Sequence, residues 1–153
     1  MSGRRVVLVI EDGTEYMEAL ARLAPPDVEA PELVRAGSLA EARRMLADRK
    51  PSAVLLDVVF DRAPEEELAG DLAGLIARFG GDRARATRNL AENQGFYILD
   101  ALADELTELP VVLAYDFSTE PQRLEALRRR VPRLSGLAEG ASISQALEML
   151  LAS

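Results

Sequence analysis

The chain has no cysteine and no histidine, and Lys50 is its single lysine among 153 residues. Without cysteine there is no disulfide, no thiolate nucleophile and no thiolate zinc site. Without histidine there is no imidazole to act as a base, a metal ligand or a phosphocarrier, which excludes Ser-His-Asp hydrolysis. Any chemistry must therefore rest on carboxylates, hydroxyls, arginine, backbone groups and a bound ion.

Aromatic residues, long apolar runs and positive charge are also scarce. Aromatic residues make up 5% of the chain, and the apolar run Val6–Ile10 is far shorter than the roughly 20 residues that cross a bilayer. We therefore expect a cytoplasmic protein without a membrane segment. Eighteen basic residues against 26 acidic ones give a net charge of −8, which repels a phosphate backbone. We expect no binding to nucleic acid.

Apolar residues make up 48% of the chain and charged residues 29%, which is the profile of one globular domain spanning residues 1–153. Apolar, β-branched runs alternate with helical patterns along it. Strands are expected at residues 5–10, 32–36, 53–59, 110–114 and 134–138. Helices are expected after Thr14, after Ser38, over about 119–130 and after Ser142. This alternation predicts a parallel sheet with right-handed crossovers and helices on both faces.

The regular alternation is interrupted at residues 61–94, which we interpret as a helical insertion. Leu68, Leu72, Leu75, Ile76 and Phe79 keep helical spacing before Gly80-Gly81 breaks the pattern. A further helix with Phe96 and Leu99 on one face follows, and it could begin as early as Asp82.

Charge in this segment is split between an acidic first part and a basic second part. The acidic residues are Glu65, Glu66, Glu67 and Asp71, and the basic ones are Arg78, Arg83, Arg85 and Arg88. One interpretation is that these charges complement helix dipoles and solvate an outer face. The other is that the segment forms a lid or docking surface whose arginines bring positive charge to an anionic site.

Acidic residues follow the first and third predicted strands. Glu11 and Asp12 come after the first, and Asp57 lies near the carboxyl end of the third. In such a sheet the ligand crevice lies outside the carboxyl ends of the strands. If the two strands are neighbours, the three carboxyl groups repel one another unless a cation neutralises them. Mg²⁺ suits such oxygen ligands. The alternative is that acidic residues simply end strands where the chain meets solvent.

These segments resemble the receiver domains of two-component response regulators. Val7–Asp12 is similar to the first strand and acidic pair of that family, and Val54–Asp57 to its phosphoacceptor strand. Gly95 before Phe-Tyr-Ile-Leu is similar to the start of the third helix, and Pro110–Leu113 to the fourth strand. The resemblance spans nearly the whole chain except residues 61–94. It implies an α/β, flavodoxin-like, doubly wound five-stranded parallel sheet of strand order 2-1-3-4-5.

The resemblance also implies roles for individual residues. Asp57 would accept a phosphoryl group from a histidine kinase or another donor. Asp12, Asp57, the backbone carbonyl of Val59 and, through water, Glu11 would hold Mg²⁺. The chain would then act by contact with a histidine kinase or another signalling protein rather than as an enzyme, and a homodimer is left open.

Two family positions are altered. No lysine follows Lys50, so the place of the family's switch lysine is taken by Glu139, as nearly as spacing allows. The hydroxyl residue that ends the fourth strand is replaced by Ala114 or Tyr115. These changes favour an alternative, a phosphorylation-independent pseudo-receiver that serves as a constitutive interaction scaffold. An aspartate-based phosphohydrolase is a third hypothesis, but no second acid lies two residues after Asp57.

Overall fold

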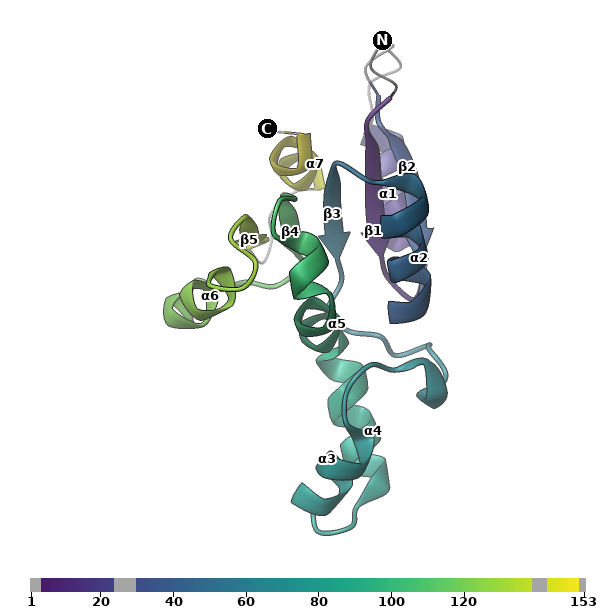
Figure 1. Cartoon of the computed structure of the whole chain (residues 1–153), viewed down its shortest axis with the longest axis vertical. Coiled ribbons are helices and arrows are strands. Elements are labelled where there is room, and N and C mark those ends of the chain that lie inside the picture. Colours follow the sequence, from purple (N-terminus) through teal and green to yellow (C-terminus); the bar gives the residue numbers. More distant parts are fainter. Residues whose placement is uncertain (1–3, 24–29, 139–142, 152–153) are drawn as a thin grey trace.

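The computed structural model describes residues 4–23, 30–138 and 143–151 (Figure 1). The strands in these residues are β1 (Val6–Ile10), β2 (Glu32–Ala36), β3 (Ala53–Leu56), β4 (Val111–Leu113) and β5 (Leu134–Gly136). All neighbouring pairs are parallel, and the strand order is β2-β1-β3-β4-β5. The predicted fold class and strand order are confirmed.

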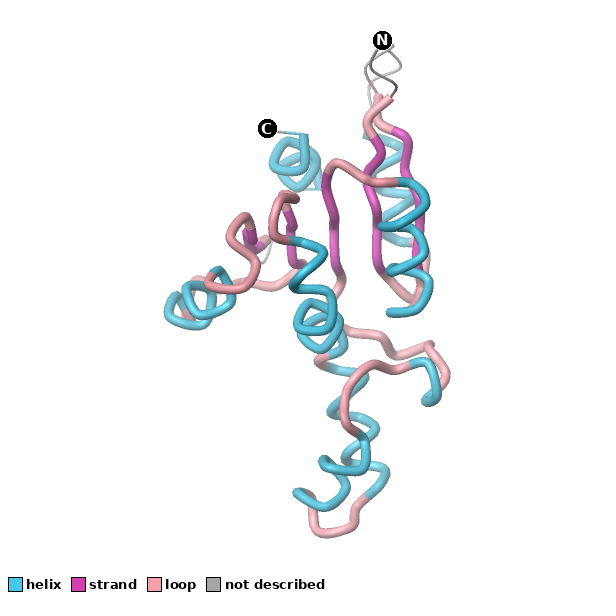
Figure 2. The backbone as a smooth tube through the Cα atoms, in the orientation of Figure 1, coloured by secondary structure: helices cyan, strands magenta, loops and turns pink. Residues whose placement is uncertain are grey.

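Helices cover both faces of this sheet (Figure 2). They are α1 (Glu15–Leu23), α2 (Leu39–Arg49), α3 (Leu72–Arg78), α4 (Arg83–Glu92), α5 (Gln94–Leu102), α6 (Pro121–Arg128) and α7 (Ile143–Leu151). Two 3₁₀ turns are η1 (Glu65–Glu67) and η2 (Ala103–Leu106). Helices α1 and α7 pack together on one face, and α2 and α5 pack together on the other. Among the described residues no helix is long and apolar enough to span a membrane.

The core consists of two apolar layers, one on each face of the sheet. Alternate side chains of the central strands enter opposite layers, as Leu8 and Leu56 do on the α2–α5 side and Val9 and Leu55 on the α1–α7 side. Both sets are fully buried. Burial on both faces explains why β1 and β3 are uninterrupted apolar runs rather than alternating ones.

Several predicted elements are longer than those observed. The third strand was predicted to reach residue 59, but β3 ends at Leu56. The chain bends at Val58, whose N–H donates to the Asp57 carboxylate at 2.9 Å. The predicted Ser38 cap is confirmed, because its Oγ accepts from the N–H of Glu41 at 3.2 Å. The predicted cap at Ser142 lies outside the described residues.

Residues 61–94 contain η1, α3 and α4. Helices α3 and α4 form a hairpin that extends beyond the carboxyl edge of the sheet (Figure 1), around a small core of Leu75, Ala86 and Leu90. The predicted break at Gly80-Gly81 is confirmed, and both glycines have positive φ. Leu68, predicted as helical, lies outside α3 because it follows η1 in extended conformation.

Candidate acidic site at the carboxyl edge of the sheet

Glu11 and Asp57 leave neighbouring strands at the same edge of the sheet. Ile10 is the register partner of Leu56, and the N–H of Asp57 donates to the carbonyl of Ile10 at 2.9 Å. The two acids are therefore the next residues along adjacent parallel strands. This confirms the predicted neighbourhood of the first and third strands on which the candidate site depends.

The Glu11 carboxylate caps helix α1. The side chain is almost fully buried, with 1% of its surface exposed. Its Oε1 accepts from the N–H of Tyr16 at 3.0 Å, and its Oε2 accepts from the N–H of Met17 at 2.9 Å. These N–H groups belong to the first turn of α1, where they lack partners inside the helix. Sequence reasoning missed this capping role.

Asp12 connects the β1–α1 turn to the chain that follows β3. Its Oδ2 accepts from the backbone N–H of Arg62 at 2.6 Å. The Arg62 guanidinium forms an ion pair with Glu15 at the start of α1. Two bonds therefore hold the loop after Asp57 against the turn after β1. Arg62 was not among the sequence-based candidates.

Asp57 is half-buried in acidic surroundings. Burial raises the pKa of its carboxyl group to about 6, and the negative charges of Glu11, Asp12 and Glu15 act in the same direction. The hydrogen bond from the Val58 N–H acts against them by stabilising the ionised form. Negative charge at this edge is thus incompletely compensated.

The donor chemistry of this edge suits a hard divalent cation held by few protein ligands. Among the described residues, no three acidic side chains are arranged as a preformed metal cage. Mg²⁺ does not need one, because it commonly binds one or two carboxylates and keeps several waters. Asp12 and Asp57 each use one carboxylate oxygen in the protein hydrogen bonds described above. Both oxygens of Glu11 already accept N–H groups.

Gly95 allows α5 to pack directly against the loop that carries Asp57. A Cβ at this position would lie 2.4 Å from the carbonyl oxygen of Asp57 and 2.8 Å from the Cα of Val58. The N–H of Gly95 donates to the carbonyl of Val58 at 3.0 Å. The close approach requires glycine, because both atoms that a side chain would meet belong to the backbone.

Gln94, which sequence reasoning missed, fastens the 61–94 segment to α5. Its side chain is 1% exposed; Oε1 accepts from the N–H of Ala69 at 2.6 Å, and Nε2 donates to the carbonyls of Ala69 and Leu90 at 3.1 Å. The N–H of Phe60 also donates to the carbonyl of Ala91 at 2.8 Å. In the sequence, Gln94 stands out only as an amide residue next to Gly95, just before the apolar helix face that begins at Phe96.

Ala114 lies on the rung next to Asp57, where its N–H donates to the carbonyl of Leu56 at 2.9 Å. Its methyl group offers no hydrogen-bond donor. The residue that follows, Tyr115, turns its ring toward Phe96 and Phe117, with centroids 5.0 and 4.9 Å away. Glu139 lies outside the described residues.

The Tyr115 hydroxyl is engaged by the start of α6. It donates to Glu120, and Nη1 of Arg123 donates to it at 3.2 Å. The hydrogen bond to Glu120 raises the pKa of Tyr115 because it stabilises the protonated phenol. The Arg123 guanidinium also lies 3.8 Å from the centre of the Phe96 ring. Tyr115 is therefore part of an aromatic and charged cluster.

Two of the four arginines singled out in the 61–94 segment have partners within it. Arg83 forms an ion pair with Glu65, and the Arg85 guanidinium lies 4.4 Å from the centre of the Phe79 ring. These contacts hold η1 and the α3–α4 hairpin together.

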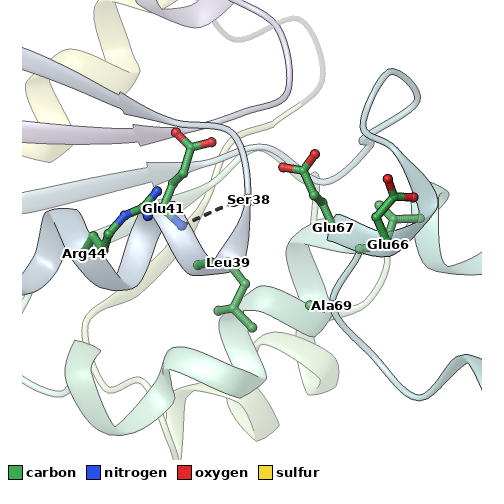
Figure 3. A pocket seen from close by; sticks show the side chains of 9 residues that line it. Ser38, Leu39, Glu41, Arg44, Glu66, Glu67 and Ala69 are labelled. Atoms are coloured by element: carbon green, nitrogen blue, oxygen red, sulfur yellow. Dashed lines mark hydrogen bonds between the residues drawn. The ribbon is translucent and has the colours of Figure 1, made fainter.

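A groove of about 430 Å³ lies between the start of α2 and η1 (Figure 3). Its lining includes Ser38, Leu39, Glu41, Arg44, Glu66 and Glu67. None of the residues Glu11, Asp12 and Asp57 lines it. The groove is thus a separate feature, with carboxylates from both sides.

Comparison with known proteins gives a likeness of structure only. No protein-family model and no curated protein sequence matches the chain. The chain is similar to the solved receiver domain of NtrX from Brucella abortus, with 18% identity, a TM-score of 0.58 and coverage of 96% of this chain and 99% of that one. The chain has the receiver fold.

Two further solved structures agree with this result. Chemotaxis response regulator CheY4 of Vibrio cholerae is 13% identical, with a TM-score of 0.58 and coverage of 97% of this chain and 100% of that one. The receiver domain of the Francisella response regulator 1452 is 12% identical, with a TM-score of 0.59 and coverage of 96% and 93%. At such identities the likeness establishes the fold, and function must be argued from the residues.

Proposed function

We propose that this chain is a receiver-like signalling domain that accepts a phosphoryl group at Asp57. The observation that carries the proposal is the desolvated Asp57 carboxylate, placed beside Glu11 and Asp12 at the carboxyl edge of a receiver-fold sheet. Residues 1–153 form one domain in this proposal, and residues 61–94 are a helical insertion within it. The phosphoryl donor is a histidine kinase or a small acyl phosphate.

The chemical step is an in-line displacement at phosphorus. A carboxylate oxygen of Asp57 attacks, an O–P bond forms, and the P–N or P–O bond of the donor breaks with its electron pair leaving on the donor. An ionised carboxylate needs no general base. Because the pKa of Asp57 is about 6, most of this group is ionised at neutral pH in the absence of other ligands.

Asp12, Asp57 and the backbone carbonyl of Val59 would hold Mg²⁺ directly, and Glu11 would contribute through water. A bound Mg²⁺ supplies positive charge that neutralises the transferring phosphoryl oxygens. The protein's own contribution is positional. The α1 cap fixes Glu11, the Arg62 N–H orients Asp12, and the Val58 N–H orients one oxygen of Asp57.

The output in this proposal is a protein contact rather than a turnover reaction. The partner is the histidine kinase or another signalling protein, and a second copy of the chain is a further partner. The proposed location is the cytoplasm.

A second candidate function is a pseudo-receiver that works as a scaffold without phosphorylation. One observation favours it: the Tyr115 hydroxyl is already engaged by Glu120 and Arg123. In addition, Lys50 follows α2 and precedes β3, so it lies at the amino edge of the sheet, away from Asp57. The hydroxyl and the lysine that contact the phosphoryl group in receiver domains thus have no free counterpart in Tyr115 or Lys50.

Nuclear magnetic resonance with Mg²⁺ and beryllofluoride, a mimic of the phosphoryl group, separates the two functions. If Asp57 is a phosphoacceptor, amide signals of residues 57–60 and of the β1–α1 turn shift at millimolar ligand. Asp57→Asn should abolish the shifts, and Asp61→Asn, which changes an exposed carboxylate four residues away, should preserve them. A wild-type protein without shifts would rule out phosphorylation as the working mode and leave the scaffold function.

A further inference from the structure

The Arg62 side chain lies across the β1–α1 turn at the acidic edge. Its guanidinium pairs with Glu15, and its Nη1 stands where a side chain on Gly13 would begin, 2.2 Å from the position of a Cβ there. Its backbone N–H is fixed separately to Asp12. The backbone of Arg62 is therefore anchored at the site, and its guanidinium pairs with the exposed Glu15.

That ion pair is easily exchanged for another. The side chains of Arg62 and Glu15 are each 60% exposed. Exposed ion pairs add little to stability, because water solvates both charges well when they separate. Arg62 can therefore leave Glu15 for a stronger anion at small cost.

A phosphoryl group on Asp57 would be such an anion. It would add negative charge to an edge where Glu11, Asp12 and Glu15 already act on Asp57. The planar fork of N–H donors on a guanidinium matches two phosphoryl oxygens as it matches a carboxylate. The phosphoryl group carries more negative charge than a carboxylate, so it attracts the guanidinium more strongly.

Three other arginines, Arg35, Arg83 and Arg85, are already engaged by other groups. Arg35 donates its Nε to the carbonyl of Gly13 at 2.5 Å and is thus committed to the backbone of the turn. Arg83 and Arg85 are engaged within the α3–α4 region. Arg62 combines a fixed backbone beside Asp12 with a guanidinium whose partner is exposed.

We propose that Arg62 binds the phosphoryl oxygens at Asp57 and releases Glu15 when it does so. Arg62 thereby supplies, from the loop after β3, the positive charge that receiver domains take from a lysine after the fifth strand. Release of Glu15 frees the first turn of α1 from the loop after β3, so that occupancy of Asp57 is reported on the surface of α1. This inference rests on the proposed phosphorylation of Asp57.

The test compares beryllofluoride binding in the presence of Mg²⁺ by wild-type protein, Arg62→Gln, Arg62→Lys and Arg83→Gln. Loss of a charge-assisted contact predicts about a tenfold or greater weakening for Arg62→Gln. Arg62→Lys, which keeps the charge without the fork, should fall between. Arg83→Gln is the matched control, because Arg83 also pairs with a glutamate from an exposed position.

A second readout separates binding from a merely structural role. The Nε–H signal of Arg62 should shift when beryllofluoride binds to the wild-type protein, and Glu15→Gln should bind at least as tightly as wild type. Unfolding of Arg62→Gln should match wild type, since the backbone N–H to Asp12 is retained. If wild type binds and Arg62→Gln binds equally well, the role of Arg62 is overturned while the proposed function stands. If wild type does not bind, both are overturned.

Discussion

The N–H of Gly95 donates to the carbonyl of Val58 at 3.0 Å, which joins the start of α5 to the residue after Asp57. The backbone of α5 thus packs directly against the loop that carries Asp57. This contact leaves no room for a Cβ at residue 95.

Gly95→Ala should therefore strongly destabilise the protein. The new Cβ would meet the Asp57 carbonyl and the Val58 Cα, and neither backbone atom can move without shifting β3 or α5. We expect a loss of roughly 3 kcal/mol or more in the free energy of unfolding, measured in urea. Gly74→Ala in α3 is the control, because there the obstructing atoms belong to the Asp71 side chain. Equal stabilities for the two variants would contradict the packing described.

Asp57→Asn should stabilise the metal-free protein at neutral pH. The pKa of Asp57 is raised from 3.8 to about 6 in the folded state. Between those values the unfolded chain loses the proton first, so stability falls as pH rises, and the full penalty persists above about pH 6. Removing the charge should restore on the order of 1–2 kcal/mol, since the group is partly solvated.

The check is urea unfolding with a chelator from about pH 4 to about pH 8. The advantage of Asp57→Asn should be absent at the acidic end and complete at the alkaline end. Asp48→Asn, on the exposed face of α2, serves as the matched control. An advantage for Asp57→Asn that stays constant across this range would show that burial does not raise the pKa of Asp57.

Gln94→Leu should loosen the connection between the 61–94 segment and α5. The substitution leaves the N–H and carbonyl of Ala69 without their partner in a buried place. Each unpaired buried group costs about 1–3 kcal/mol, so we expect the free energy of unfolding to fall by an amount near the upper end of that range. Hydrogen exchange at Ala69 should accelerate markedly. Gln122→Leu, on the exposed side of α6, should change neither quantity, and an equal effect there would refute the assignment.

Arg123→Ala should loosen the packing of α6 against the rest of the protein. No residue of α6 is fully buried, and its half-buried Leu124 and Leu127 pack against the core, so polar contacts of the helix add to a modest apolar interface. Arg123 stacks on Phe96 and bonds the Tyr115 hydroxyl, and its loss should cost about 1 kcal/mol. Amides of residues 121–128 should exchange faster, while those of β1 and β3 stay protected. Glu125→Ala on the same helix is the control; matching exchange in both variants would argue against this role.

The sheet and the place of Asp57 could be predicted because they follow from local patterns. Buried parallel strands are continuous apolar runs, and β1 and β3 are both of this kind. An acid directly after such a run must lie at the carboxyl edge. The strand order, which brings Glu11 beside Asp57, came instead from the resemblance to receiver domains.

The detailed bonding of the site could not be predicted, because its partners are far apart in the sequence or lie at unusual offsets. Arg62 meets Asp12 across 50 residues, and a charged residue after a strand is ordinarily solvated. Glu11 caps α1 from outside the usual capping position, with Thr14 closer in sequence. The expected helix from Asp82 onward was nearly right, but Asn93 divides it into α4 and α5.

The two hydrogen bonds that flank Asn93 have a mechanical consequence. The carbonyl of Ala91 in α4 accepts from the N–H of Phe60, and the N–H of Gly95 in α5 donates to the carbonyl of Val58. The two adjoining helices are therefore bonded to the two ends of residues 58–60, which follow Asp57 directly. A protein that binds the α3–α4 hairpin and tilts α4 would either break the hydrogen bond between Phe60 and Ala91 or move residues 58–60 together with α4. If a partner bound at the hairpin changed the affinity of Asp57 for a ligand, that ligand would change the affinity for the partner by the same factor.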